Sequence, residues 1–279
     1  GIDIVADILL NSTFEEEELV RERSVLLLEI GQAADTPDDI IFDHFQATAY
    51  PGQALGRPVL GTADIVGKIS RNTVIKFITD NYGGGQMVFS AAGNVDHEDL
   101  VDRVQLQFSS LPQKAVSKIE PANYLGGDWR QYKDLEQVHL ILGFPAATFY
   151  DPDFYAQQVL SMLLGGGMSS RLFQEVREKR GLVYGISSFS SSYTDTGMFG
   201  VYAGTGESQI QELIPVLCDE FKKSPNSITE KEIKAFLEEI NSSDEISIDI
   251  EFMRRNTFFP EPCVIQLSNG YFHGCIDLT

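Results

Sequence analysis

Two apolar runs constrain what this chain can fold into, because each is dense enough in hydrophobic residues to lie inside a sheet. The first is QMVFSAAGNV (residues 86–95) and the second is QVHLILGFP (residues 137–145). A short apolar run bounded by turn residues is typical of a buried strand. An amphipathic helical pattern follows each run, at 96–108 and 151–164. The pattern therefore predicts an α+β fold in each half of the chain.

The region between the halves has the composition of a linker. Residues 109–133 lose their periodicity and contain Pro112, Pro121 and a pair of adjacent glycines. The last part of the chain also lacks a sustained period, so it is either irregular or foreign to the fold. We therefore expect four parts: a first domain at 1–110, a linker at 111–133, a second domain at 134–241 and a divergent tail at 242–279.

Helix signals are frequent in both halves. Caps and apolar periodicity predict helices at 2–10, 12–32, 37–50, 70–82, 97–108, 152–164, 170–180, 207–224 and 228–240. Ser12 or Thr13 is expected to cap the second of these helices. The acidic run Glu15–Glu18 then falls in its first turns, where the helix dipole favours anions. We interpret this run as a solvated helix start rather than a metal cluster.

The stretch ERSVLLLEIGQ (residues 22–32) places a carboxylate at each end of an apolar run. In a helix, Glu22 and Glu29 are separated by almost two turns and share a face. Val25 and Leu26 lie on that face at the spacing of a core-facing stripe. A buried carboxylate is costly unless a cation, a hydrogen-bond donor or a metal accepts it. The stretch therefore predicts a site, or more simply two solvated acids on the flank of the stripe.

Charge narrows the possible partners. The formal net charge is −20, from 41 acidic and 21 basic residues. This balance argues against nucleic acid and anionic membrane surfaces as partners, because a protein binds either of them through clustered Lys and Arg side chains. It suits a soluble acidic protein, and also one that takes a basic peptide. No apolar stretch is long enough to predict a membrane span.

The cysteines and the first residues of the chain give little further information about fold or function. The 3 cysteines form no disulfide framework. The spacing of Cys263, His273 and Cys275 matches no tetrahedral zinc pattern. The chain begins with Gly1 and enters a helical pattern at once, so we expect it to start within a domain and see no signal peptide.

Several stretches, taken together, resemble the M16 metallopeptidase family, the pitrilysin and mitochondrial-processing-peptidase group. They are ERSVLLLEI, DTPDDIIFDHF, YPGQALGRPVLGT, MVFSAAGNVDHEDL, QVHLILGFP and LGGGMSSRLFQEVREKRGLVYGISS. The resemblance covers residues 1 to about 241 and is strongest to the processing-peptidase branch. It implies two domains that face each other, each an antiparallel-rich sheet packed with helices. Both domains look incomplete in this chain.

The resemblance also implies a site. The family binds zinc through an inverted H-x-x-E-H helix and a downstream Glu. By position, that downstream Glu is Glu29, and Glu22 is an auxiliary acid that orients or tunes the site. Arg177 and Tyr184 match the family's Arg and Tyr that hold the substrate or its tetrahedral intermediate. The family acts on peptides or unfolded polypeptides and forms homo- or hetero-dimers.

One departure decides the activity question, because the chain contains no H-x-x-E-H. None of its four histidines (His44, His97, His139 and His273) has a second His three or four residues away. We interpret His44 as a packed or edge histidine and His139 as a satisfied strand histidine. Since a catalytic zinc usually needs three protein ligands, we predict that residues 1–279 bind zinc poorly and hydrolyse no peptide. Glu22 and Glu29 should then face solvent or pair with a cation.

Two functions remain open. The chain is either a fragment of a zinc-dependent endopeptidase or a non-catalytic, M16-like subunit that pairs with an active partner. The retained acids, Arg177 and Tyr184 favour the first, and the missing metal helix favours the second. The compartment also stays open, since the family occurs in the bacterial cytoplasm or periplasm and in the mitochondrial matrix.

Overall fold

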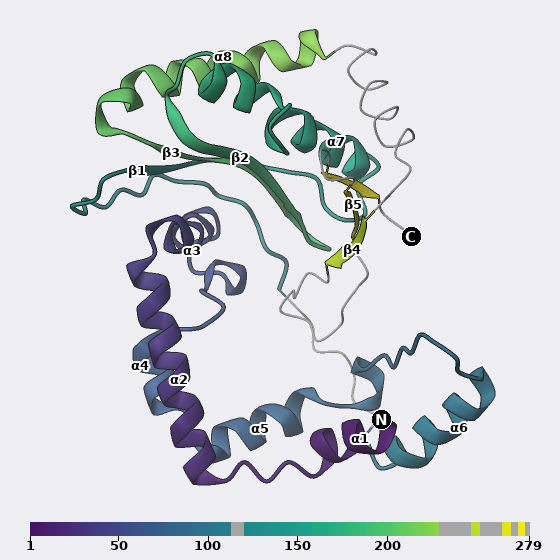
Figure 1. Ribbon diagram of the computed structural model, residues 1–279. Helices are drawn as coiled ribbons and strands as arrows, with labels where there is room; N and C mark the ends of the chain where they lie inside the picture. Colours follow the sequence, from purple (N-terminus) through teal and green to yellow (C-terminus); the bar gives the residue numbers. More distant parts are fainter. Residues whose placement is uncertain (113–119, 229–246, 252–263, 269–272, 277–279) are drawn as a thin grey trace. The chain divides into compact units, whose positions relative to one another are not determined.

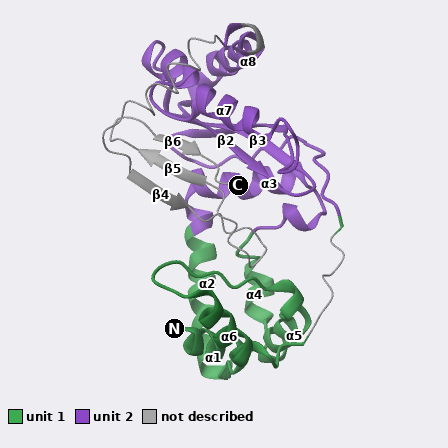
Figure 2. Cartoon of the chain, turned by 90° about the vertical axis from the view of Figure 1, so that its right-hand side faces the viewer, with its two compact units in different colours: residues 1–32, 59–120, 254–260 green, residues 33–58, 121–253, 261–279 purple. Residues whose placement is uncertain are grey.

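The computed structural model describes residues 1–112, 120–228, 247–251, 264–268 and 273–276 (Figure 1). The helix predicted at 228–240 falls almost wholly outside this part of the chain. Contacts divide the chain into two compact units (Figure 2). Unit 1 comprises residues 1–32, 59–120 and 254–260, and unit 2 comprises residues 33–58, 121–253 and 261–279. Each unit is described by itself below.

Helices make up the regular structure described in unit 1. They are α1 (Ile2–Leu10), α2 (Glu16–Asp35, whose last residues belong to unit 2), α4 (Ala63–Lys68), α5 (Arg71–Asn81), the short η2 (Gly84–Gln86) and α6 (His97–Phe108). Predicted caps hold α5 and α6. The Ser70 hydroxyl accepts from the amide of Thr73 at 3.2 Å, and the Asp96 carboxylate accepts from the amide of Asp99 at 3.0 Å. These caps satisfy amides that the first helical turn leaves unpaired.

The predicted cap of α2 is wrong. The helix begins at Glu16, whereas Ser12 donates its hydroxyl to the carbonyl of Ile8 and so belongs to the end of α1. Phe14 has a φ of 48°, a left-handed conformation that interrupts a right-handed helix. The acidic run still supplies the first turn, with Glu16, Glu17 and Glu18 in it.

The strand predicted at 86–95 is also wrong. After η2, residues 87–95 are irregular, and Val88 is 76% exposed. A strand needs a neighbour to accept its backbone hydrogen bonds. Within the part of unit 1 that the structure describes, no strand lies beside this segment. This apolar segment therefore has no described sheet to join. Among the described residues, helices combine with a sheet in the second half of the chain and not in the first.

Unit 2 contains a three-stranded antiparallel sheet in the order β1-β3-β2. Its strands are β1 (Val138–Pro145), β2 (Val183–Ser192) and β3 (Gly197–Thr205), and β2 and β3 form a hairpin. Two helices, α7 (Phe154–Gly165) and α8 (Ile210–Ser227), pack on one face (Figure 1). The core on this side includes Leu164, Leu172, Val176, Val201, Leu213 and Leu217, each at most 2% exposed.

The opposite face of the sheet is covered by α3 (Pro37–Ala49), which also belongs to unit 2 (Figure 1). Phe45 and Phe42 lie against Phe189 of β2, with ring centroids 5.7 and 5.2 Å apart. Glycines leave space for these rings. A Cβ at Gly143 would collide with Phe45, and a Cβ at Gly200 would collide with Phe189.

The C-terminal end of α3 is anchored by Tyr50, which is fully buried. Its hydroxyl lies 3.1 Å from the Thr196 hydroxyl in the β2–β3 turn. Residues of the predicted linker pack here as well, because the amide of Leu125 donates to the carbonyl of Ala49 at 2.9 Å. Trp129 stacks on His44 of α3, with ring centroids 3.8 Å apart. Residues 121–133 are thus part of unit 2 rather than a free connection within this chain.

The tail contains regular backbone structure. Three short strands, β4 (Ser247–Glu251), β5 (Val264–Ser268) and β6 (His273–Ile276), pair antiparallel in that order. The irregular interpretation is therefore wrong for these residues. The sequence SIDIE alternates polar and apolar residues, but this strand signal is too short to stand out in a longer stretch of sequence.

Among the described helices, none has the length and hydrophobicity needed to cross a bilayer.

Candidate functional site

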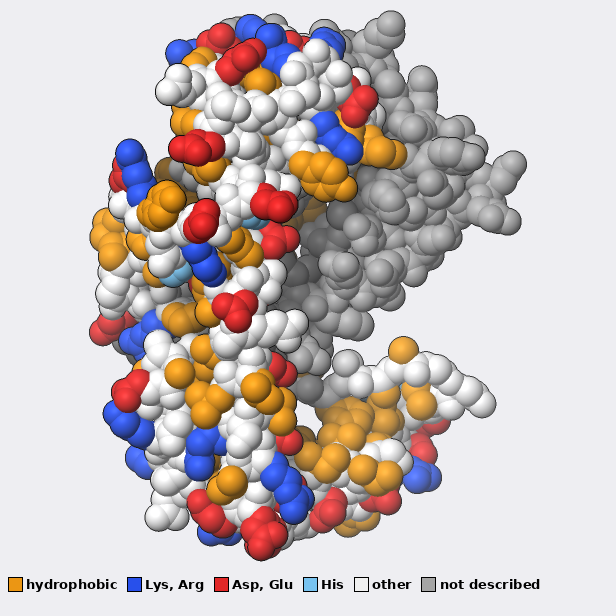
Figure 3. Space-filling view, turned by 60° about the vertical axis from the view of Figure 1, so that its left-hand side comes forward, with side chains coloured by type: hydrophobic (Ala, Val, Ile, Leu, Met, Phe, Trp, Pro, Cys, Tyr) orange, Lys and Arg blue, Asp and Glu red, His pale blue; other side chains and the backbone are white. Residues whose placement is uncertain are grey.

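Glu22 and Glu29 lie on α2 as predicted, and they face solvent, one of the two arrangements expected for these acids without zinc. Both side chains are exposed, and α2 has no buried residue. Val25, expected in the core, is 47% exposed, and Leu28 is 74% exposed. Leu26, the other residue of the stripe, is only half-buried, so the predicted inward stripe is wrong. Figure 3 shows hydrophobic side chains open on the surface of the molecule.

The described residues do not fit a zinc site. They contain no group of three His, Cys, Asp or Glu side chains arranged to hold a metal ion. Glu29 is a single candidate ligand, below the usual three. His139 is engaged elsewhere, with its Nδ1 atom 2.9 Å from the Tyr202 hydroxyl. His44 is stacked on Trp129. These two histidines are the packed and satisfied ones that the sequence predicts.

Arg177 and Tyr184, in contrast, lie together in unit 2. The guanidinium carbon of Arg177 is 5.7 Å from the centroid of the Tyr184 ring. Arg177 is half-buried, while Tyr184 is 77% exposed. A cation and a phenol side by side at the surface present hydrogen-bond donors in one place. The family resemblance implied that these two residues act as a pair, and the structure places them side by side.

Backbone irregularities position both residues. Arg177 lies in a π-helical segment, η3 (Phe173–Glu178). Tyr184 is the extra residue of a β-bulge, because Val183 pairs with Thr205 and Gly185 already pairs with Gly204. π-helical turns and bulges occur often at functional sites, where they redirect a side chain. The bulge lets Val183 and Ile186 both point into the core while Tyr184 points out.

The segment between the two residues is a tight turn. Gly181 has a φ of +63°, a left-handed conformation that favours glycine. Its amide donates to the carbonyl of Arg177 at 2.9 Å, and the amide of Leu182 donates to the carbonyl of Val176 at 3.0 Å. These bonds end the helix and start β2 within a few residues. The predicted stop at Gly181 is therefore confirmed, and it brings the helix end next to Tyr184.

Within the part of the chain that the structure describes, Arg177 has no carboxylate partner. Glu175 on the same helix binds Lys179 and Arg180, each at 2.8 Å. Hydrogen bonds from Lys179 and Arg180 lower the pKa of Glu175, whereas its partial burial opposes them. Among the described residues, no acid pairs with Arg177. Instead its guanidinium carbon lies 4.6 Å from the centroid of the Phe173 ring.

Sequence reasoning missed Phe173 as part of this site. The available signal was its position four residues before Arg177, which places both side chains on one helix face. Aromatic and cationic side chains at that spacing attract each other. Within the apolar pattern of SRLFQEV, however, the phenylalanine looks like an ordinary core residue.

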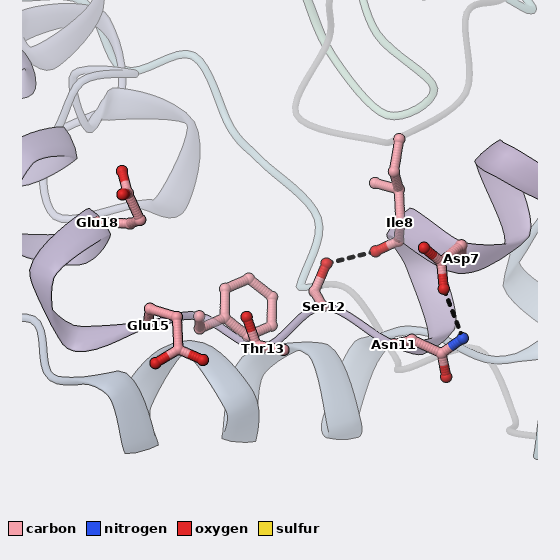
Figure 4. Close-up of a pocket in the computed structure, with 8 residues that line it drawn as sticks. Asp7, Ile8, Asn11, Ser12, Thr13, Glu15 and Glu18 are labelled. Carbon is pink, nitrogen blue, oxygen red and sulfur yellow. Dashed lines mark hydrogen bonds between the residues drawn. The ribbon is translucent and has the colours of Figure 1, made fainter.

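An open cavity of about 430 Å³ lies in unit 1 between the end of α1 and the start of α2 (Figure 4). Asp7, Glu15 and Glu18 are among its lining residues. Two of these acids already have partners, because Asn11 donates to Asp7 at 2.8 Å and Arg21 donates to Glu18 at 2.6 Å. None of the predicted site residues lines this cavity.

Comparison with known proteins identifies the family. A family profile described as "Peptidase M16 inactive domain" matches residues 68–239, and one described as "Insulinase (Peptidase family M16)" matches residues 1–63. An uncharacterized zinc protease of Rickettsia bellii is 41% identical over 87% of this chain and 59% of its own length. Mitochondrial-processing peptidase subunit beta of Homo sapiens is 33% identical over 84% of this chain and 50% of its own length.

Solved structures share the fold. The crystal structure of a peptidase M16 inactive domain from Pseudomonas fluorescens superposes with a TM-score of 0.77, at 24% identity, over 88% of this chain and 60% of that one. The mixed fold of helices with an antiparallel sheet is thus shared with a solved M16 domain. The chain belongs to the peptidase M16 family. It spans less than two thirds of the length of the curated relatives above.

Proposed function

We propose that this chain is the substrate-holding part of a zinc-dependent endopeptidase of the processing-peptidase type. The observation that carries the proposal is the Arg177–Tyr184 pair, which a π-helical turn and a β-bulge bring together. The names of the relatives, zinc protease and processing peptidase, support the same reaction class. In this proposal the first domain spans 1–110 and the second spans 134–241, with residues 111–133 connecting them in the whole protein.

The proposed role of the pair is to hold a peptide carbonyl. Arg177 supplies guanidinium N–H donors and Tyr184 supplies a phenolic O–H. Donors aimed at a carbonyl oxygen stabilise the negative charge that develops when the carbonyl is attacked. The net charge of −20 suits a basic peptide as the ligand.

Hydrolysis requires more than this pair. Glu29 is proposed as one metal ligand and Glu22 as an acid that tunes the metal, and two further ligands must come from elsewhere. Because the described residues contain no such set, we propose that residues 1–279 bind peptide without cleaving it.

The second candidate is a non-catalytic subunit or interaction module that pairs with an active partner. The observation in its favour is that the profile matching 68–239 describes an inactive domain. Both candidates hold a peptide through Arg177 and Tyr184, but only the first needs Glu29 to meet a metal.

Binding and cleavage are tested on the purified chain. A fluorescently labelled, unstructured basic peptide should bind, and Arg177→Ala should weaken binding about tenfold, since a charged hydrogen bond contributes about 1.5–3 kcal/mol. Arg103→Ala is the matched control, because Arg103 is a surface arginine paired with Asp99 on α6. Equal binding by Arg177→Ala and the unchanged chain would refute the role of Arg177.

Zinc titration of the same sample tests the absence of hydrolysis. We expect no stoichiometric zinc and no cleavage that a chelator stops. Stoichiometric zinc together with chelator-sensitive cleavage would overturn the proposal. The coding DNA separates the two candidates: an H-x-x-E-H encoded upstream in any reading frame favours the protease, and a start codon directly before the codon of Gly1 favours the partner subunit.

A further inference from the structure

Two aromatic rings surround the Arg177 guanidinium. Its central carbon lies 4.6 Å from the Phe173 centroid and 5.7 Å from the Tyr184 centroid. Both distances fall inside the range over which the face of an aromatic ring attracts a cation. Phe173 is the nearer ring, and it comes from the same π-helical segment as the arginine.

Phe173 itself is held by the protein core. Its side chain is half-buried and packs against the buried cluster of unit 2 that includes Leu172, Val176 and Leu213. A ring fixed by a close-packed core has few alternative rotamers. Phe173 therefore gives Arg177 a rigid surface, whereas Tyr184 is 77% exposed and less restrained.

The way in which Arg177 is held affects what it can bind. A salt bridge to a carboxylate would occupy the N–H donors of the guanidinium and neutralise its charge. A ring contacts the face of the guanidinium and leaves the N–H groups at its edge available. Glu175, the half-buried acid on this helix, is occupied by Lys179 and Arg180.

We propose that Phe173 is a positioning residue for Arg177, which holds the guanidinium through its ring so that the N–H donors stay available to a peptide. The functional part of this inference rests on the proposed function of Arg177. Its geometric part does not, and the two parts are tested separately.

The geometric test uses nuclear magnetic resonance of the full chain with labelled arginine. Ring currents from Phe173 and Tyr184 should displace the side-chain resonances of Arg177, which the loss of its signals in Arg177→Lys identifies. Phe173→Leu keeps an apolar side chain of similar size but removes the ring, so it should move these resonances toward those of exposed arginines. Phe173→Tyr keeps the ring and should preserve them. Unchanged Arg177 resonances in Phe173→Leu would overturn the proposal.

The functional test measures binding of the labelled basic peptide. Phe173→Leu should weaken binding roughly threefold to tenfold, in line with a partly desolvated cation–ring contact, and Phe173→Tyr should restore it. Phe221→Leu is the matched control, because Phe221 packs against the same core and its ring neighbours are Phe144 and Phe199.

Three outcomes decide between positioning and general stability. Weak binding by Phe173→Leu alone, with rescue by Phe173→Tyr, supports the proposal. Equal weakening by Phe221→Leu assigns Phe173 a merely structural role and refutes it. If the unchanged chain binds no peptide, the proposed function fails, while the Arg177 resonances still decide whether Phe173 holds the guanidinium.

Discussion

The stacked pair of His44 and Trp129 provides a direct optical test of how residues 121–133 pack. The chain contains 1 tryptophan, so its emission reports on this site alone. Trp129 is 43% exposed, and its ring lies 3.8 Å from that of His44, at an interplanar angle of 19°. Aromatic pairs contribute about 0.5–1.5 kcal/mol beyond burial, and the exposure of Trp129 places this pair near the lower end.

Burial lowers the pKa of His44 below its ordinary value, and the nearby carboxylate of Asp43 opposes this effect only in part. The folded state therefore favours the neutral imidazole. As pH falls, the unfolded chain takes up its proton first, at about pH 6.5. The contribution of this site to stability is present above that pH and is lost as pH falls to the folded pKa.

The assay follows Trp129 emission while the pH is lowered. A protonated imidazole quenches a stacked indole, so emission should fall with a midpoint below about 6.5. His44→Phe keeps a ring against the indole and should remove the transition. Asp43→Asn removes the attraction that raises the pKa of His44 and should lower the midpoint further. A midpoint at or above the ordinary value, or the same transition in His44→Phe, would refute the stacked and buried arrangement.

Three further substitutions test the fold. Tyr50→Phe should cost about 1 kcal/mol in urea unfolding, because it removes the buried hydrogen bond to Thr196; no loss would contradict that bond. Gly197→Ala should cost about 2 kcal/mol or more, because a Cβ there collides with two backbone carbonyl groups. Gly185→Ala, where a Cβ meets no atom within 4 Å, is its control in the same measurement. Glu175→Gln should cost up to about 1 kcal/mol near pH 7, and the loss should disappear as the pH falls through the lowered pKa of Glu175 in the folded state, since a depressed carboxyl pKa stabilises the fold in full only above its unfolded value. A pH-independent loss would rule out the charge pair as the cause.

Local signals predicted most helices because they act within a few residues. Ser70 and Asp96 cap α5 and α6, two of the helices predicted from caps and apolar periodicity. The same kind of reasoning failed at Ser12, where the end of α1 competes for the hydroxyl. It failed more widely at 86–95, because a strand depends on a neighbour that is distant in the sequence. An apolar run indicates that a segment can be buried. It does not indicate whether the fold contains a sheet against which the segment can pack.

The candidate site also divides into features that the sequence predicted and features that depend on packing between elements. The spacing of REKRGLVY, read through the family resemblance, predicted that Arg177 and Tyr184 act together. No sequence pattern predicted the π-helical turn or the β-bulge, and the bulge depends on how β2 pairs with β3. The inward face of α2 was predicted from periodicity alone. Periodicity indicates which face of a helix would favour a packing partner, but it does not show that a partner is present, and the face of α2 is exposed.

The two proposed tasks, holding a substrate and binding a metal that activates water, need different arrangements of residues. This difference is consistent with Arg177 and Tyr184 lying together while Glu22 and Glu29 lie exposed on α2. Arg177 and Tyr184 are separated by seven positions and are joined by one turn, so local backbone geometry is enough to bring them together. A zinc centre needs ligands from separate elements, and each ligand is positioned only when all of those elements are present. Glu29 lies on an exposed helix and is a single candidate ligand, while the Arg177 guanidinium lies 4.6 Å from the centroid of the Phe173 ring. We therefore propose peptide binding without hydrolysis, whichever of the two proposed roles the chain serves.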